Sequence, residues 1–145
     1  MTEIVALNEE NVSAAAELSA KCLREAWSGQ TLCAQLKNQN DHTFLAYVDG
    51  KAAGFVSCWC VAGEAEINNI CVLPEYRRRG IARAMFEKLE EVLPDAERWV
   101  LEVRESNSAA KALYESLGFA RVGLRKDFYD DPTENAVIMA KTVIK

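Results

Sequence analysis

A short basic turn in front of a glycine is the part of this sequence best suited to binding a charged ligand. Three consecutive arginines, Arg77 to Arg79, precede Gly80, and apolar residues recur at helical spacing after it. The first turn of a helix has backbone N–H groups without partners and carries partial positive charge. A glycine there lets a ligand approach the backbone, and the arginines raise the local positive potential. These residues predict a site for a phosphate or pyrophosphate, although a solvated basic turn before an ordinary helix has the same composition.

The segment before this turn is predicted to be a strand that ends at a proline. Ile67 to Val72 is mostly apolar and rich in β-branched residues, which is typical of a strand buried on both faces. Pro74 ends the strand because it has no N–H to donate to a neighbour. A helix then begins at or just before Gly80 and ends near Pro94. The basic turn therefore connects a central strand to a helix.

The residues ahead of the central strand alternate between strand and helix patterns. The predicted strands are 1–7, 43–48 and 52–61, and the predicted helices are one that Asn8 or Asn11 caps and one over 31–38. Asp49-Gly50 predicts a β-hairpin, because this dipeptide tolerates the positive φ of a tight turn. Trp27, in the break between the two helices at 26–29, is expected to cover the core, with a place in a substrate groove as the alternative.

Beyond the basic helix, the patterns predict one more helix and three more strands. The predicted strands are 99–103, 120–124 and 136–143. Ser106 or Asn107 is expected to cap the helix, and Gly118 to end it. Because no repeat or linker interrupts the 145 residues, we expect 1–145 to form a single mixed α/β domain.

Composition limits the classes of partner and cofactor. The net charge of −5, with both signs well mixed, argues against nucleic acid as the main partner, and no apolar run is long enough for a membrane span. Five cysteines, an odd number lying mostly in apolar segments, indicate packed thiols in a reducing cytoplasm. Cys58 and Cys60 lie on one predicted strand and His42 is the only histidine, so we expect no metal site.

Two stretches match the signatures of a known family. The first is Arg77-x-x-Gly80-x-Ala82 after a strand. The second is Leu101-Glu102-Val103-Arg104-x-Ser106-Asn107-x-x-Ala110-x-x-Leu113-Tyr114-x-x-Leu117-Gly118-Phe119. Together they resemble the two signatures of the Gcn5-related N-acetyltransferases, and the resemblance covers nearly the whole chain. Ala82 stands where many members have a second glycine, and its methyl group is expected to crowd a pyrophosphate only slightly.

The resemblance implies a fold and a cosubstrate. The fold is a central mixed, mostly antiparallel sheet of about six to seven strands with about four helices, and the cosubstrate is acetyl-CoA. Backbone groups of the central strand are implied to hold the pantetheine and polarise the thioester carbonyl. The implied cofactor-binding residues are Ile70, Cys71, Val72, Arg77, Arg78, Arg79, Gly80, Ile81, Ala82, Arg83 and Asn107. The individual roles of the three arginines stay open, and an ordinary helix cap is the alternative for Asn107.

Acetyl transfer to an amine needs a group that accepts a proton, because an α-amino group with a pKa of about 8 is mostly protonated at neutral pH. Glu102 is the candidate base, since partial burial among Trp99, Leu101 and Val103 would raise the pKa of its carboxylate. The resemblance places the family's general base at Glu102 and its proton donor at Tyr114. The alternatives are a Glu102 that points to water and a Tyr114 that is only a core aromatic.

The resemblance is strongest to a bacterial branch that acetylates the N-terminal alanine of a small-subunit ribosomal protein. It is carried by Asn68-Asn69-Ile70, by Leu101 to Arg104 and by Arg125 to Tyr129, a segment expected either to contact the acceptor or to be a plain strand end. A protein N-terminus is therefore the implied acceptor, by direct transfer in a ternary complex. The alternatives are a small amine, such as a polyamine or an amino acid, and a non-catalytic acyl-CoA-binding regulatory module.

Overall fold

One mixed sheet runs through the protein, in a computed structural model that describes residues 1–22, 27–130 and 132–143. Its seven strands are hydrogen-bonded in the order β1-β2-β3-β4-β5-β7-β6. The strands are β1 (Thr2–Ala6), β2 (Asp41–Val48), β3 (Lys51–Val61), β4 (Glu64–Val72), β5 (Arg98–Arg104), β6 (Ala120–Tyr129) and β7 (Glu134–Thr142). The helices of the described residues are α1 (Val12–Cys22), α2 (Gly29–Leu36), the short 3-10 helix η1 (Pro74–Tyr76), α3 (Ile81–Val92) and α4 (Ser108–Ser116). The predicted mixed α/β fold is confirmed.

The chain forms two compact units. The first consists of Met1–Cys60 and Asn68–Pro94, and the second of Val61–Ile67 and Asp95–Lys145. Strand β4 contributes to both, because its residues up to Ile67 belong to the second unit and the later ones to the first. No helix in the described part of the chain is long and apolar enough to cross a membrane.

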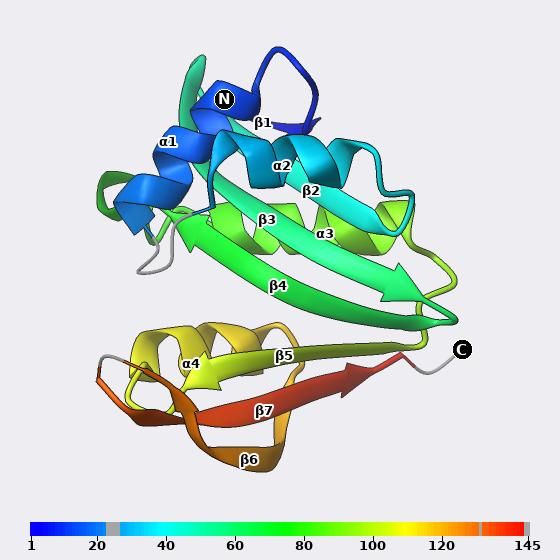
Figure 1. Cartoon of the computed structure of the whole chain (residues 1–145), viewed down its shortest axis with the longest axis vertical. Helices are drawn as coiled ribbons and strands as arrows, with labels where there is room; N and C mark the ends of the chain where they lie inside the picture. Colours follow the sequence, from blue (N-terminus) through cyan, green and yellow to red (C-terminus); the bar gives the residue numbers. More distant parts are fainter. Residues whose placement is uncertain (23–26, 131, 144–145) are drawn as a thin grey trace. The chain divides into compact units, whose positions relative to one another are not determined.

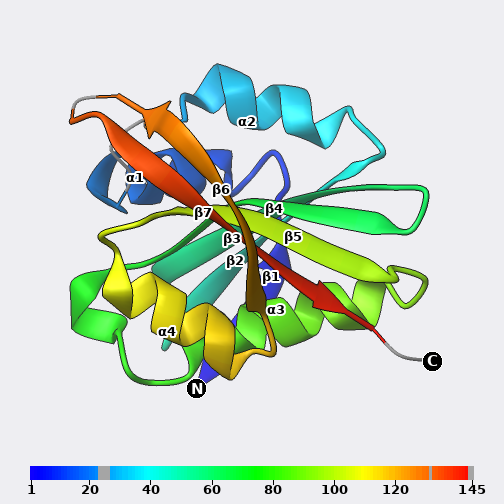
Figure 2. The ribbon, with the colours of Figure 1, turned by 90° about the horizontal axis from the view of Figure 1, so that it is seen from below.

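In the first unit, α1 and α2 lie on one face of the sheet and α3 lies on the other (Figure 1 and Figure 2). β2 pairs antiparallel with both β1 and β3. The core on the α1 and α2 side consists of Leu7, Val12, Ala15, Leu18, Leu32, Leu45, Phe55, Cys71 and Leu73. Trp27 packs against this core with its ring 6.0 Å from that of Phe55, which confirms its predicted place over the core.

The predicted β2–β3 hairpin is confirmed, and its turn has the expected backbone. Asp49 and Gly50 have φ values of 49° and 82°, as the tight turn requires. The prediction for α2 is wrong at its start, because the helix begins at Gly29 rather than at Thr31. The reason is the Ser28 hydroxyl, which accepts a hydrogen bond of 3.1 Å from the N–H of Thr31 and so caps the helix earlier. The predicted helix break at 26–29 begins outside the described residues.

In the second unit, α4 lies beside the strands β5, β7 and β6 (Figure 2). The first residues of β4 pair parallel with β5, from Glu64 opposite Arg98 to Ile67 opposite Leu101. β7 pairs antiparallel with β5 and with β6, which forms the edge of the sheet. β6 is longer than predicted, because it continues beyond Leu124 through the segment that ends at Tyr129.

Candidate active site

The basic turn leaves its backbone open for a ligand. Gly80 is the N-cap of α3 with a φ of 75°, and a Cβ placed on it would meet nothing within 4 Å. The first bond inside the helix runs from the N–H of Ala84 to the carbonyl of Gly80, at 3.0 Å. The N–H groups of Ile81 and Ala82 precede that bond, and first-turn N–H groups have no acceptor inside their own helix. The turn therefore leaves space for a ligand beside these N–H groups.

The structure separates the three arginines, whose roles the sequence left open. The Nε of Arg77 donates a hydrogen bond of 3.0 Å to the carbonyl of Val72, so Arg77 ties the turn to the end of β4. The guanidinium of Arg79 lies 5.4 Å from the ring centre of Tyr76. Arg78 is exposed and has a φ of 65°, which is unusual for a residue with a side chain. Arg83, one helical turn further on, is also exposed.

Residues Ile70 to Val72 end the central strand beside an unusually close neighbour. A Cβ on Gly54 of β3 would collide with the carbonyl oxygen of Cys71, so only glycine allows this approach of the two backbones. The prediction that this strand is buried on both faces is wrong. Cys71 is buried, whereas Ile70 and Val72 on the other face are half-buried. The pairing of β4 with β5 runs from Glu64 to Ile67, so Ile70 to Val72 lie beyond it.

Cys71 is poorly suited to act as a nucleophile. Its thiol is buried in the core of the first unit, and burial, together with the neighbouring Cys22 thiol, raises its pKa. The thiolate is the reactive form of cysteine. At neutral pH Cys71 therefore stays a thiol, which favours direct transfer to the amine.

Glu102 lies on β5 and is half-buried, but its neighbours differ from those predicted. Trp99, Leu101 and Val103 are buried on the opposite face of the strand, because successive side chains of a strand point to opposite faces. The side chain of Glu102 is 21% exposed, and its Oε1 lies 3.6 Å from Nη1 of Arg125. The expected partial burial of Glu102 is observed, but Trp99, Leu101 and Val103 do not supply it, because they lie on the other face of β5. The alternative that Glu102 simply points to water does not describe it either.

Asn107 and Tyr114 belong to α4, which follows β5 directly. The Oδ1 of Asn107 accepts a hydrogen bond of 3.1 Å from the N–H of Ala110, so Asn107 is the helix cap that was expected. Tyr114 is 7% exposed and packs edge-on against Phe119. Burial raises the pKa of Tyr114, and the nearby Tyr129 adds to this effect. Its hydroxyl is therefore protonated at neutral pH and able to donate a hydrogen bond.

A cluster around Arg104 was not predicted as part of the site. The guanidinium donates to the carbonyls of Asp130 and Pro132, at 3.1 and 3.2 Å, and pairs with Oε1 of Glu134 at 3.3 Å. It also lies 4.4 Å from the ring centre of Tyr129. Because Oε2 of Glu134 accepts from the N–H of Ser106 at 2.6 Å, the cluster ties the β6–β7 connection to the start of α4.

Sequence analysis could not assign this cluster, because its members are far apart in the chain and join only in the fold. Arg104 appeared as part of a signature, without a role of its own. Glu134 lies between the predicted strands 120–124 and 136–143 and had no predicted role. The sequence feature that could have indicated this cluster is the aromatic pair Phe128 and Tyr129. The pair lies on β6, a strand that is largely exposed.

The structure assigns the predicted residues to the two units. The turn 77–83 and Ile70 to Val72 lie in the first unit, whereas Glu102, Asn107 and Tyr114 lie together on β5 and α4 of the second. Among the described residues, no group of three or more His, Cys, Asp or Glu side chains could hold a metal ion.

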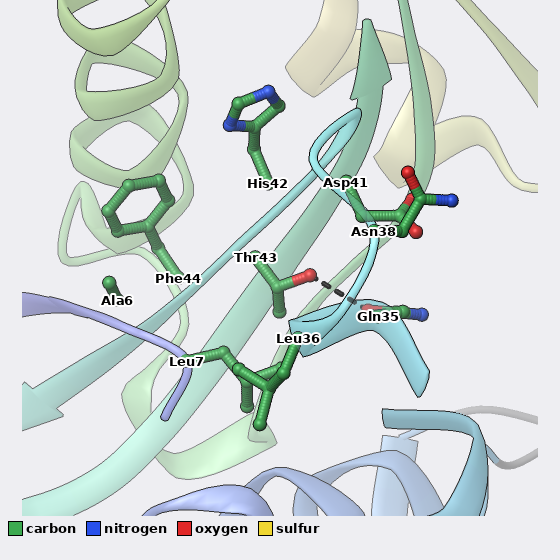
Figure 3. A pocket seen from close by; sticks show the side chains of 9 residues that line it. All are labelled: Ala6, Leu7, Gln35, Leu36, Asn38, Asp41, His42, Thr43 and Phe44. Carbon is green, nitrogen blue, oxygen red and sulfur yellow. Dashed lines mark hydrogen bonds between the residues drawn. The ribbon is translucent and has the colours of Figure 1, made fainter. Parts of the chain in front are cut away.

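A separate pocket of about 190 Å³ lies in the first unit, beside the end of β1 and the beginning of β2 (Figure 3). It is lined by Ala6, Leu7, Gln35, Leu36, Asn38, Asp41, His42, Thr43 and Phe44. The Thr43 hydroxyl donates to Oε1 of Gln35 at 2.9 Å across one wall. Burial lowers the pKa of His42, against the opposing effect of Asp41. None of these nine residues belongs to the predicted site.

Three features together are those of an acyltransferase. They are the sheet order, the open helix N-terminus after the central strand, and the residues of β5 and α4. The family model for the acetyltransferase (GNAT) family matches residues 8–119, and the chain belongs to this family. Enzymes of the family use acetyl-CoA as cosubstrate. The predicted resemblance is thereby confirmed.

Individual relatives and solved structures match nearly the whole chain. The chain is 38% identical to the ribosomal protein bS18-alanine N-acetyltransferase of Escherichia coli K12, over 97% of each chain. The crystal structure of the ribosomal-protein-S18-alanine N-acetyltransferase from Escherichia coli matches with a TM-score of 0.89 and 35% identity, covering 100% of this chain and 96% of that one. A PaiA N-acetyltransferase from Thermoplasma acidophilum in complex with coenzyme A, at 20% identity, a TM-score of 0.83 and 99% of each chain, shares the fold.

Proposed function

We propose that residues 1–145 act as one N-acetyltransferase domain that acetylates the N-terminal alanine of ribosomal protein bS18 in the cytoplasm. The observation that carries this proposal is the 38% identity to the Escherichia coli enzyme of that name over 97% of both chains. Such a match spans both the basic turn and the β5–α4 residues, so it covers the parts that would bind the cosubstrate and those that would carry out the transfer.

The basic turn would hold the pyrophosphate of acetyl-CoA. The backbone N–H groups of Gly80, Ile81 and Ala82 are the main donors, because Gly80 leaves the backbone open. Arg78 and Arg83 are exposed and add positive charge. The Nε of Arg77 donates a hydrogen bond to the carbonyl of Val72. The backbone of Ile70 to Val72, beyond the residues of β4 that pair with β5, would pair with the pantetheine. Asn107 would add its side-chain N–H₂, because its Oδ1 serves the helix cap.

Glu102 would accept one proton from the bound ammonium group, which frees the lone pair of the amine to attack the thioester carbon. As the new N–C bond forms and the C–S bond breaks, the second proton leaves the nitrogen for solvent and CoA departs as a thiolate. Glu102 is a partly buried carboxylate on β5, the strand that leads into α4. An acceptor amine can therefore reach this carboxylate. Because Cys71 is held as a thiol, the amine attacks the thioester directly and no acetylated enzyme is formed.

Tyr114 would stabilise the departing sulfur through a hydrogen bond. A thiol with an ordinary pKa of about 8.5 is a stronger acid than a tyrosine with a pKa of about 10. Burial raises the pKa of Tyr114 further, so complete proton transfer to the thiolate is unfavourable. Hydrogen bonding without full transfer still stabilises the negative charge that develops on sulfur.

The test is acetylation of a short peptide that begins with alanine and copies the N-terminus of bS18. Parallel reactions contain the same peptide with its N-terminus blocked, and a panel of polyamines and amino acids. Turnover on the free peptide alone is expected. Turnover on small amines but not on the peptide would establish the small-amine alternative, and acetyl-CoA binding without turnover on any acceptor would establish the binding module.

Replacement of the proposed base tests the mechanism in the same assay. Glu102→Gln keeps the size of the side chain and removes its basicity, so kcat should fall by about 10² to 10³. Glu66→Gln is the matched control, because Glu66 is an exposed carboxylate on the neighbouring strand β4. Equal activity of the two variants would contradict the role of Glu102.

A further inference from the structure

The proposed base already has a cationic partner in the free protein. Nη1 of Arg125 lies 3.6 Å from Oε1 of Glu102, which brings together strands β6 and β5 although β7 lies between them in the sheet. The Glu102 side chain is 21% exposed, whereas that of Arg125 is 57% exposed. The carboxylate is therefore the more buried member of the pair and the guanidinium is the more accessible one.

An acceptor amine reaches the protein as an ammonium ion and is attracted to the same carboxylate. A carboxylate oxygen that is engaged with a guanidinium has less capacity to accept a proton from a second cation. Two cations that share one carboxylate also repel each other. Binding of the acceptor at Glu102 and retention of the Arg125 contact therefore oppose each other.

We propose that Arg125 is a resident counter-ion of Glu102 that the ammonium group of the acceptor displaces, so that Arg125 lowers the affinity for every amine acceptor. This inference rests on the proposed role of Glu102 as the base. Arg125 thus sets the affinity of the site for amines as a class. It imposes one common cost on all acceptors and leaves their relative affinities unchanged.

The surroundings of Arg125 allow such a displacement. Its guanidinium lies 5.5 Å from the ring centre of Phe128, which is itself 43% exposed. Phe128 in turn packs edge-on against Tyr129, whose ring lies beside Arg104. The Arg125 side chain can therefore leave the carboxylate and keep its aromatic partner, because a cation over an aromatic face is stabilised independently of the ion pair.

The experiment measures the Kd of the alanine peptide by calorimetry, with CoA present, for four proteins. These are the wild type, Arg125→Met, Glu102→Gln and the double variant, and they form a double-mutant cycle. Methionine keeps the length and apolar character of the arginine side chain and removes its charge. Arg121→Met is the control for the loss of one positive charge, because Arg121 is also exposed on β6.

We expect Arg125→Met to bind the peptide about two- to fivefold more tightly than the wild type, as suits one exposed ion pair. The same factor should apply to a small amine, and the gain should disappear in the Glu102→Gln background. Weaker binding in Arg125→Met, a gain equal to that of Arg121→Met, or a gain that persists without the carboxylate would each overturn the proposal.

Failure of the proposed function gives a different result. If the peptide is not acetylated, the cycle is run with the amine that is, because displacement of Arg125 concerns any ammonium group. If kcat is the same in Glu102→Gln as in the wild type, the role of Glu102 as the base fails. The binding cycle still reports in that case whether Arg125 competes with the acceptor at this carboxylate.

Discussion

The two parts of the candidate site use different chemistry. The basic turn of the first unit offers mainly backbone groups, set by the left-handed conformation of Gly80 at the start of α3. The β5–α4 region of the second unit offers side chains: a carboxylate, an amide and a phenol. A site built from backbone groups depends on the conformation of the chain. A site built from side chains depends on which residues are present.

The two parts also differ in how local they are. The turn lies within the seven residues 77–83, so its chemistry is contained in one short segment. The second part includes Glu102 and Arg104 of β5, Arg125 of β6 and Glu134 of β7, which the sheet brings together. Substitutions should therefore act on the first part through backbone conformation and on the second through loss of individual groups.

After the replacement of Glu102, the next largest effect is expected from Tyr114, in the side-chain part. Tyr114→Phe removes only the hydroxyl and keeps the ring that packs against Phe119, so the fold should be retained. Loss of one hydrogen bond to the departing sulfur should lower kcat by about 10 to 100-fold. Steady-state kinetics with the peptide acceptor would measure this, and an unchanged kcat would show that Tyr114 is only a core aromatic.

A smaller effect should follow from a change of backbone conformation at the turn. Gly80→Ala finds open space, but a φ of 75° costs an alanine about 1 to 2 kcal/mol. The turn should relax toward negative φ and raise the KM for acetyl-CoA about tenfold. Gly50→Ala is the matched control, since Gly50 has a φ of 82° and equal space in the β2–β3 hairpin. Both variants should lose stability, but only Gly80→Ala should bind acetyl-CoA more weakly.

The same contrast explains what could be predicted from the sequence. The strand, the proline stop and the helix at Gly80 were predictable because hydrophobic periodicity and glycine chemistry act over a few residues. The hairpin at Asp49-Gly50 and the cap at Asn107 were predictable for the same reason. Each of these features depends on backbone conformation that neighbouring residues determine.

The predictions failed where tertiary contacts decide the outcome. The neighbours of Glu102 were misjudged, because apolar residues beside it in the sequence lie on the other face of β5. The pairing of Glu102 with Arg125 depends on the order β5-β7-β6, and the contact of Arg104 with Glu134 depends on the pairing of β5 with β7. The close approach of Gly54 to Cys71 likewise depends on two adjacent strands and not on either segment alone.

Asn107 joins both kinds of chemistry, and two substitutions can separate them. Asn107→Ala removes the side chain that caps α4 and should lower the free energy of unfolding by about 1 kcal/mol. Asn107→Asp keeps an acceptor for the N–H of Ala110, replaces the N–H₂ group by a second oxygen and adds a negative charge. We expect the aspartate variant to keep its stability in urea unfolding but to bind acetyl-CoA a few-fold more weakly. Weaker binding in the alanine variant alone would assign Asn107 to the cap and not to the cofactor.

The smallest expected effect concerns the pH dependence of stability in the second unit. The hydrogen bonds that Ser106 donates to Glu134, and then the Arg104 guanidinium, hold the pKa of Glu134 below its ordinary value of 4.5. A carboxylate with a lowered pKa in the folded state stabilises the fold above its unfolded pKa, and this contribution disappears as the pH falls through the lowered value.

Glu134→Gln should therefore lose less stability than the wild type when the pH is lowered from about 5 to below the folded pKa. Urea unfolding over this range measures the difference, and equal slopes for the two proteins would show that Arg104 and Ser106 do not stabilise the Glu134 charge. Arg104→Met should fall between the two, because it removes the guanidinium but leaves the stronger Ser106 contact in place.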